Sequence, residues 1–513
     1  MKNIKYIGLL ALGLISCEPE FENPVDEPGF YTSGEANFTT YVALGNSLTA
    51  GYADAALYLT GQKNSYPKIL SEQFAKVGGG DFTQPLVDDN TGGMLLNGEP
   101  FFPNRLVLSF DAEGNPVPAP YNGTPTTEIT DILSGPFNNL GVPGAKSYHL
   151  LAGGYGNLQG LATQTANPYF VRFASSPGTS IIEDAIAQKP TFFSLWIGNN
   201  DVLAYATSGG VGTIPESADP ATYGSNDITP PAVFTGVYTR LVTALTQDGA
   251  GGILVNIPNV TDIPFFTTVP VNAIPLDAET AAVLNAKFAA YNQQILPGLV
   301  QAGAITLEEM SERRIIFSEG MNFVTLSDES LTDISAIIQG PPFNLDEQTA
   351  NLLGQLRQAT PADLIPLSSS GTLGSTVGGN PLMIMGVSVP LPDQHVLTPE
   401  EQELVAQATQ AYNLTIERLA GEFGLALLDA SALLSKLEET GIAFDAGVLT
   451  SAYVTGGAFS LDGIHLTPRG AALMANKMIE EINATYGATV PKVNIGNYGT
   501  ITPSNDVKRV TIQ

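Results

Sequence analysis

Asp462 and His465 place a carboxylate three residues before an imidazole, just ahead of a predicted helix start at Pro468. The chain has two other histidines, His149 and His395. Histidine is the usual general base near neutral pH, because its unperturbed pKa lies in that range. A carboxylate beside one ring nitrogen fixes the tautomer and leaves the other nitrogen free to take a proton. The pair therefore requires a nucleophile from elsewhere in the chain.

Ser47 is the candidate nucleophile. It lies in the segment Gly-Asn-Ser-Leu-Thr-Ala-Gly that follows a short β-prone run at 39–44. In open α/β sheets, sites gather at the carboxyl ends of strands, where a hydroxyl can be presented. A serine hydroxyl is a weak nucleophile and needs an adjacent base. The alternative is that Ser47 caps the helix that follows, and the segment alone does not decide between the two roles.

Two turns offer hydrogen-bond donors. The sequence Gly-Asn-Asn-Asp, whose second asparagine is Asn200, follows the apolar run 191–197. It could form only a turn, or it could direct an amide at a developing oxyanion. The turn at 138–145 contains Gly141 and Gly144, and a glycine there can expose its backbone N–H to a substrate.

In their order along the chain, the Ser47 segment, the glycine turn, the Asn200 turn and the Asp462–His465 pair resemble the SGNH, or GDSL-type, hydrolase family. The resemblance implies a catalytic triad of Ser47, Asp462 and His465, and an oxyanion hole formed by Ser47, Gly144 and Asn200. Gly141 remains an alternative to Gly144. Asn46 departs from the family pattern, which usually has Asp before the serine.

The same resemblance implies a fold and an activity. The fold is a three-layer α/β/α sandwich with a central parallel sheet, flavodoxin-like, that carries long insertions. The activity is ester hydrolysis through an acyl-enzyme, without a cofactor or a metal ion, on lipid, short acyl or acetylated glycan esters. The alternative is a non-catalytic surface lipoprotein that binds glycan or protein on the same scaffold.

Hydrophobic patterning independently predicts an α/β protein. Buried strands are expected at 191–197, 252–257 and 425–429, and helices at 67–77, 179–188, 231–247, 279–300, 399–423 and 468–486. Strands that alternate with helices predict a parallel sheet covered on both faces. We expect one domain over 39–486, with insertions near 78–137, 203–230 and 303–398, and a C-terminal extension over 487–513.

The N-terminus resembles a bacterial lipoprotein signal. Two lysines precede an apolar run at 6–15 that is too short to span a bilayer, and the run ends at Leu-Ile-Ser-Cys17, the only cysteine. The resemblance implies removal of residues 1–16 and lipidation of Cys17; an ordinary secretory signal is the alternative. Residues 17–38 are predicted to be a flexible tether. We therefore expect an exported protein anchored to the cell envelope, at the outer membrane, with a periplasmic or surface-facing body.

Charge excludes several classes of partner. The sequence has 21 basic and 50 acidic residues, a formal net charge of −29. Nucleic acids and anionic lipid surfaces need clustered Lys and Arg, so neither is an expected partner. No segment has the spacing of a calcium loop or a zinc site. His149 and His395 are interpreted as structural or polar-loop residues.

Overall fold

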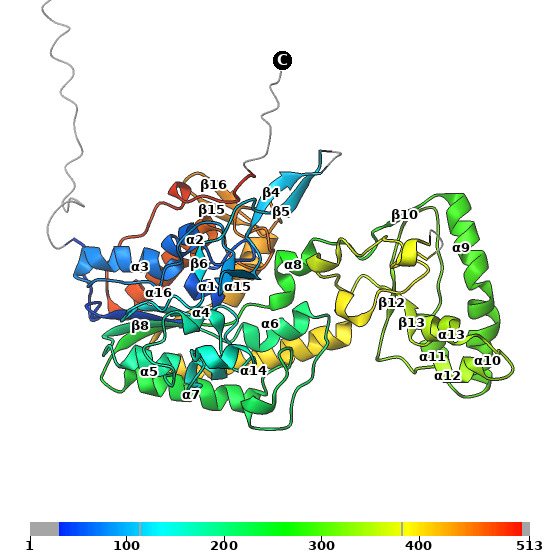
Figure 1. The fold of residues 1–513 in the computed structure, drawn as a ribbon, viewed down its shortest axis with the longest axis horizontal. Coiled ribbons are helices and arrows are strands. Elements are labelled where there is room, and N and C mark those ends of the chain that lie inside the picture. Colours follow the sequence, from blue (N-terminus) through cyan, green and yellow to red (C-terminus); the bar gives the residue numbers. More distant parts are fainter. Residues whose placement is uncertain (1–29, 112–113, 381–382, 505–513) are drawn as a thin grey trace, which may run out of the picture.

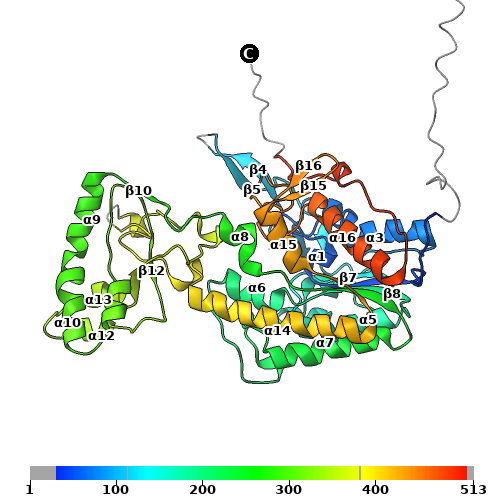
Figure 2. The ribbon, with the colours of Figure 1, turned by 180° about the vertical axis from the view of Figure 1, so that it is seen from behind.

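The structure is a computed structural model that describes residues 30–111, 114–380 and 383–504. The predicted signal peptide, Cys17, most of the predicted tether and the end of the C-terminal extension lie outside these residues. Figure 1 shows an α/β body with a lobe at one side, and Figure 2 shows the same arrangement from behind.

A five-stranded parallel sheet forms the centre of the body. Its strands, in spatial order, are β7 (Asn139–Gly141), β1 (Tyr41–Gly45), β8 (Phe192–Trp196), β9 (Gly251–Val255) and β14 (Ala426–Leu428). All five residues of β1 and of β8 are buried. Parallel strands with both faces covered are apolar along their length, which is why these segments lack polar alternation. The expected mixed α/β fold with a central parallel sheet is confirmed.

Helices cover both faces of the sheet. Helices α5 (Ile181–Ile186), α7 (Pro231–Thr246) and α14 (Pro399–Phe423) lie together on one side, and α3 (Tyr66–Phe74) and α16 (Pro468–Tyr486) on the other (Figure 2). Helix α14 begins with a capping box between Thr398 and Glu401 and ends at Gly424 in the left-handed conformation. Helices α14 and α16 have the bounds expected from the sequence.

The lobe has a hydrophobic core of its own, formed by residues between Ile274 and Val396. It contains the hairpins β10–β11 (Ile274–Leu276, Gly320–Asn322) and β12–β13 (Thr325–Ser327, Leu356–Gln358). Its main helices are α9 (Ala278–Ala290), α10 (Leu296–Gln301), α11 (Leu307–Glu312), α12 (Ser335–Gln339) and α13 (Glu347–Leu353), with a π-helical turn joining α9 to α10. The helix expected at 279–300 thus belongs to the lobe, which begins earlier than the insertion placed at 303–398.

The other two insertions differ in character. Residues 78–137, the first expected insertion, contain short strands paired in two small sheets: β2 (Met94–Leu96), β3 (Glu99–Phe102), β4 (Leu106–Phe110), β5 (Pro116–Pro120) and β6 (Thr127–Glu128). Helix α6 (Asn200–Thr207) follows β8 and extends into the 203–230 segment. The rest of that segment is mostly irregular.

The described part of the predicted tether packs against the body. Phe38 is 2% exposed, and its ring stacks on Phe74 of α3 with centroids 4.0 Å apart. A flexible tether cannot extend to residue 38, because this aromatic ring is part of the core. Nowhere in residues 30–111, 114–380 and 383–504 is there a helix long and apolar enough to cross a membrane.

Candidate active site

The candidate site lies where the strand order of the sheet reverses. The strand that follows β1 in the chain, β7, lies on one side of β1. The later strands β8, β9 and β14 lie in that order on the other side. Ligands bind open α/β sheets at such a switch point, outside the carboxyl ends of the strands. Ser47 follows β1 and Asn200 follows β8, so the two residues flank this point.

Ser47 begins the one-turn helix α1 (Ser47–Ala50) but does not cap it. Asn46 is the cap, because its side-chain oxygen accepts a hydrogen bond from the N–H of Leu48 at 3.1 Å. The hydroxyl of Ser47 is therefore not needed for the turn. It lies 2.8 Å from Nε2 of His465, and Ser47 is 7% exposed.

Asp462 and His465 complete a hydrogen-bonded chain to Ser47. Nδ1 of His465 lies 2.9 Å from Oδ2 of Asp462. An ionised carboxylate can only accept hydrogen bonds, so Nδ1 carries the hydrogen. The lone pair on Nε2 is then free to accept from the hydroxyl of Ser47. This is the tautomer that a general base requires.

Five donors surround the carboxylate of Asp462. Its Oδ1 accepts from the N–H groups of Ile464 and His465 at 2.9 and 2.8 Å and from the Ser460 hydroxyl at 3.0 Å. Its Oδ2 accepts from Nδ1 of His465 and from the N–H of Ala55 at 2.8 Å. Burial by itself raises the pKa of Asp462, but His465 and these hydrogen bonds together hold that pKa well below its usual range. Asp462 is therefore ionised at neutral pH.

The loop between Asp462 and His465 is held by a hydrogen bond from the segment that leads into the lobe. Gly463 has φ +72°, a conformation that favours glycine. Its carbonyl accepts a hydrogen bond from the N–H of Phe265, in α8 (Pro264–Thr267), at 3.0 Å. A Cβ on Gly463 would lie 3.0 Å from that same nitrogen. Glycine thus allows the close approach that fixes the loop.

Further residues, which no sequence motif indicates, hold the triad in place. Ala55, which donates to Asp462, has φ +61°, and its neighbour Asp54 has φ +52°. The buried carboxylate of Asp54 accepts from the N–H of Leu461 at 3.0 Å and lies 3.7 Å from Arg105. Asp54 thus joins the serine side of the site to the Asp462 loop. Arg105 comes from the 78–137 insertion, and no local sequence pattern relates it to Asp54.

The structure separates the two candidate oxyanion glycines. The N–H of Gly141 donates to the side chain of Asn139 at 3.0 Å, and a Cβ on Gly141 would lie 2.3 Å from the backbone nitrogen of Ala50. Gly141 therefore serves packing against α1. Gly144 is exposed with φ +81°, and its N–H donates to no residue in the described part of the chain. Gly144 is the glycine of this turn with a donor to offer.

Asn200 and the Ser47 backbone supply further donors. One N–H of the Asn200 amide donates to the carbonyl of Ala145, next to Gly144, at 2.9 Å. The amide has a second N–H for another acceptor. The backbone N–H of Ser47 is also without a partner within the described ranges. The three donors thus follow three adjacent strands of the sheet, β1, β7 and β8.

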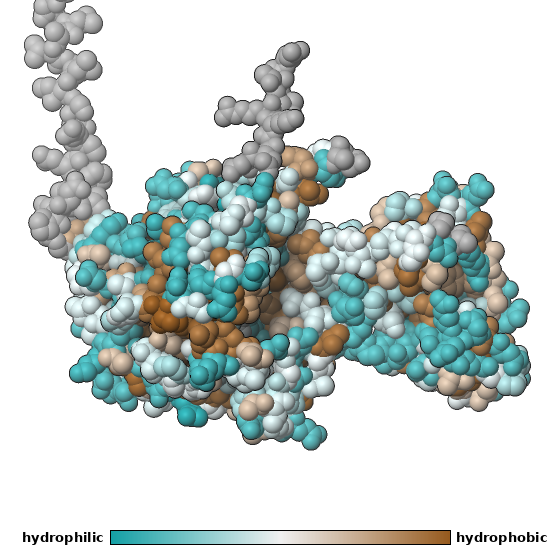
Figure 3. Space-filling view, in the orientation of Figure 1, coloured by the Kyte–Doolittle hydropathy of each residue, from teal (hydrophilic) through white to brown (hydrophobic). Residues whose placement is uncertain are grey.

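A mostly apolar cavity opens beside the triad. Ser47, His465, Asn199 and Asn200 line its polar end. Apolar side chains form most of the rest, among them Leu203, Val260, Ile263, Leu433, Leu437 and Met474. In Figure 3, apolar residues gather on the surface of the α/β body, whereas the lobe has a more hydrophilic face. The cavity can therefore receive an apolar group whose polar end lies at Ser47.

The other two histidines lie away from this cavity. His149 stacks on Tyr155 with ring centroids 4.4 Å apart, and its Nδ1 accepts from the N–H of Lys146 at 3.0 Å. Burial lowers the pKa of His149 to about 3, so the residue is neutral. His395 lies in the lobe, where its Nδ1 is 2.9 Å from the Ser369 hydroxyl. Both histidines have structural partners, and neither contacts Ser47.

The fold and the site together describe a parallel α/β protein with a Ser–His–Asp hydrogen-bonded chain at the switch point of its sheet. In comparisons with known proteins, no family model, no curated protein and no solved structure matches this chain.

Proposed function

We propose that this protein is a carboxylic ester hydrolase of the SGNH, or GDSL, type, exported and anchored to the cell envelope through Cys17. The observation that carries the proposal is the unbroken chain from Asp462 through His465 to Ser47, with distances of 2.9 and 2.8 Å. The strand order also supports it, because numbering the five strands along the chain gives 2-1-3-4-5, the flavodoxin-like order.

The proposed reaction is acyl transfer through Ser47. His465 takes the hydroxyl proton as Oγ attacks the ester carbonyl, and Asp462 stabilises the imidazolium that forms. The N–H groups of Ser47 and Gly144 and the amide of Asn200 stabilise the oxyanion. His465 then donates its proton to the leaving alcohol. A water molecule activated by the same imidazole hydrolyses the acyl-enzyme, which releases the acid and restores the serine.

The cavity favours the lipid end of the expected substrate range. Its walls are mostly apolar, so an acetyl group would leave much of this apolar lining in contact with water. An acyl chain of several carbons would displace that water, with about 0.8 kcal/mol gained for each buried CH2 group. We therefore propose esters of medium or long acyl chains as substrates, with no nucleic acid partner and no cofactor.

Covalent labelling tests the proposed nucleophile directly. We expect an alkyl fluorophosphonate to label Ser47 in the folded protein, because the reagent needs an activated serine. Peptide mass spectrometry would locate the adduct, and urea-unfolded protein is the control, since unfolding separates Ser47 from His465. Labelling of another serine, or equal labelling of folded and unfolded protein, would contradict the proposal.

Acyl-chain preference tests the role of the cavity. We expect kcat/KM for p-nitrophenyl esters to rise from acetate to octanoate, by roughly fourfold for each CH2 group that the cavity buries. Leu433→Trp fills part of the cavity and should lower the rate on octanoate while sparing acetate. Leu414→Trp, at an exposed position of α14, is the matched control. A flat chain-length profile, or the same profile for both variants, would show that the acyl group binds elsewhere.

A further inference from the structure

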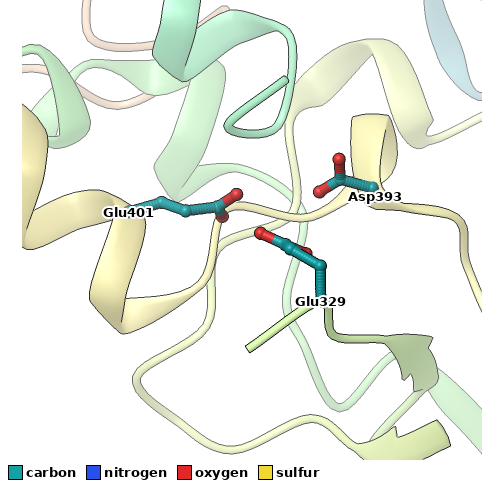
Figure 4. A group of neighbouring side chains, drawn as sticks. All are labelled: Glu329, Asp393 and Glu401. Atoms are coloured by element: carbon teal, nitrogen blue, oxygen red, sulfur yellow. The ribbon is translucent and has the colours of Figure 1, made fainter. Parts of the chain in front are cut away.

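Three carboxylates meet where the lobe joins the body. Figure 4 shows the side chains of Glu329, Asp393 and Glu401 pointing toward one another. One carboxylate oxygen from each lies within 4.8 Å of the other two. Glu329 follows β12 of the lobe, Asp393 lies in the short helix Asp393–His395, and Glu401 lies in the first turn of α14. The cluster therefore bridges the lobe and the body.

Among the described residues, one carboxylate oxygen of Glu401 has hydrogen-bond donors and the other has none. Its Oε2 accepts from the N–H and the hydroxyl of Thr398 at 2.6 and 2.8 Å, as the cap of α14 requires. Its Oε1 is buried and accepts no hydrogen bond from any residue that the structure describes. Glu401 as a whole is 4% exposed. A buried carboxylate oxygen is costly without a donor or a cation, so Oε1 is a candidate ligand atom for a cation between the three carboxylates.

The cluster has no cationic partner in the part of the chain that the structure describes. Within the described ranges, no Lys or Arg forms an ion pair with any of the three carboxylates. The nearby Arg357 is already paired with Asp328 at 2.5 Å and with Asp363 at 2.7 Å. Three acids at such close range repel one another unless a proton or a cation lies between them.

The pKa values of two of the acids show the same crowding. Burial, together with the nearby charge of Glu329, raises the pKa of Asp393 to about 7. Burial also raises the pKa of Glu401 to about 8, and Glu329 adds to this effect, although the hydrogen bonds from Thr398 oppose it.

We propose that Glu329, Asp393 and Glu401 bind a hard divalent cation, with Ca²⁺ preferred. Carboxylate oxygens are the ligands that such cations select, and exposed Glu329 leaves room for water to complete the coordination. The ligands come from three separate segments, which suits the flexible geometry of Ca²⁺ better than the strict octahedron of Mg²⁺. The bound ion would join β12 and the Asp393 turn of the lobe to α14 of the body, and so fix the lobe on the body.

The site is not visible in the sequence, because residues 329, 393 and 401 do not have the spacing of a calcium loop. It does not depend on ester hydrolysis, since none of its ligands lines the cavity beside Ser47.

Calorimetric titration of the EDTA-treated chain with CaCl2 and MgCl2 tests the proposal. We expect Ca²⁺ to bind with a Kd at or below about 1 mM, as in extracellular calcium modules, and more tightly than Mg²⁺. Ca²⁺ should also raise the midpoint of thermal unfolding, because it binds the folded state. Glu329→Gln and Glu401→Gln should each weaken Ca²⁺ binding by at least about tenfold, as loss of a charged ligand predicts.

Glu400→Gln is the matched control, since it removes one exposed charge from the same turn of α14. Its Ca²⁺ affinity should equal that of the wild type. Glu329→Gln keeps the test valid if Glu401→Gln disturbs the helix cap. Unchanged Ca²⁺ binding in Glu329→Gln, equal losses in Glu400→Gln, tighter binding of Mg²⁺, or no binding of either cation up to about 10 mM would each overturn the proposal.

Discussion

We expect Ser47→Ala to lower kcat for ester hydrolysis by about 10⁴- to 10⁶-fold and to leave the fold intact. The rate should fall because the acyl-enzyme cannot form without Oγ. The fold should persist because, within the described ranges, the Ser47 side chain hydrogen-bonds only to His465, and Asn46 rather than Ser47 caps α1. Initial rates on p-nitrophenyl octanoate and the thermal unfolding midpoint measure the two effects.

Ser311→Ala is the matched control for this variant. Ser311 lies in α11 of the lobe, where its hydroxyl donates to the Leu307 carbonyl in the same helix. We expect wild-type rates from it. If Ser47→Ala hydrolyses the ester as fast as Ser311→Ala does, the triad is not the source of activity, and the alternative of a binding protein on the same scaffold gains support.

The elements that the sequence predicts best are those with strong local signals. Helix α14 has its Thr398–Glu401 capping box, a proline at its first position and a left-handed glycine after its end. Its bounds therefore depend on neighbouring residues alone. The buried strands β8 and β9 are likewise visible as continuous apolar runs, because both of their faces are covered.

The candidate site was predictable to the same extent. Asp462 and His465 are close in sequence, and Ser47 and Asn200 each follow a predicted strand. Their supporting residues were not predictable, since Asp54 and Arg105 meet only through the fold of an insertion. The choice between Gly141 and Gly144 likewise depended on which N–H was already bonded, and spacing cannot show this.

The lobe shows a further limit of sequence patterns. Helix α9 buries Ala281, Leu284 and Phe288, and apolar residues at such spacing do not reveal which of two cores a helix packs against. The acidic cluster likewise depends on how the lobe packs against the body. Once the lobe packs on the start of α14, Glu329 and Asp393 are carried to Glu401 from distant positions.

Asp462→Asn should lower kcat by about 10⁴-fold, although the side chain keeps its size. The carboxylate accepts five hydrogen bonds on two oxygens, and asparagine retains only one oxygen. If the NH2 group faces His465, Nδ1 must accept and the proton moves to Nε2. Nε2 then cannot take the proton of Ser47. If the NH2 group faces the other way, it meets the N–H groups of Ile464 and His465 and destabilises the loop.

The two orientations lead to distinct measurements. The first orientation lowers kcat and leaves one buried donor, the N–H of Ala55, without its acceptor. The second leaves the N–H groups of Ile464 and His465 without theirs, and since each unsatisfied buried donor costs about 1–3 kcal/mol of stability, it should lower the unfolding midpoint more. Asp363→Asn is the matched control, because it removes a buried, hydrogen-bonded carboxylate from the lobe. It should lower stability but leave kcat per folded molecule unchanged. If Asp462→Asn retains kcat within about tenfold of the wild type, the carboxylate does not set the tautomer of His465 and the proposed mechanism is wrong.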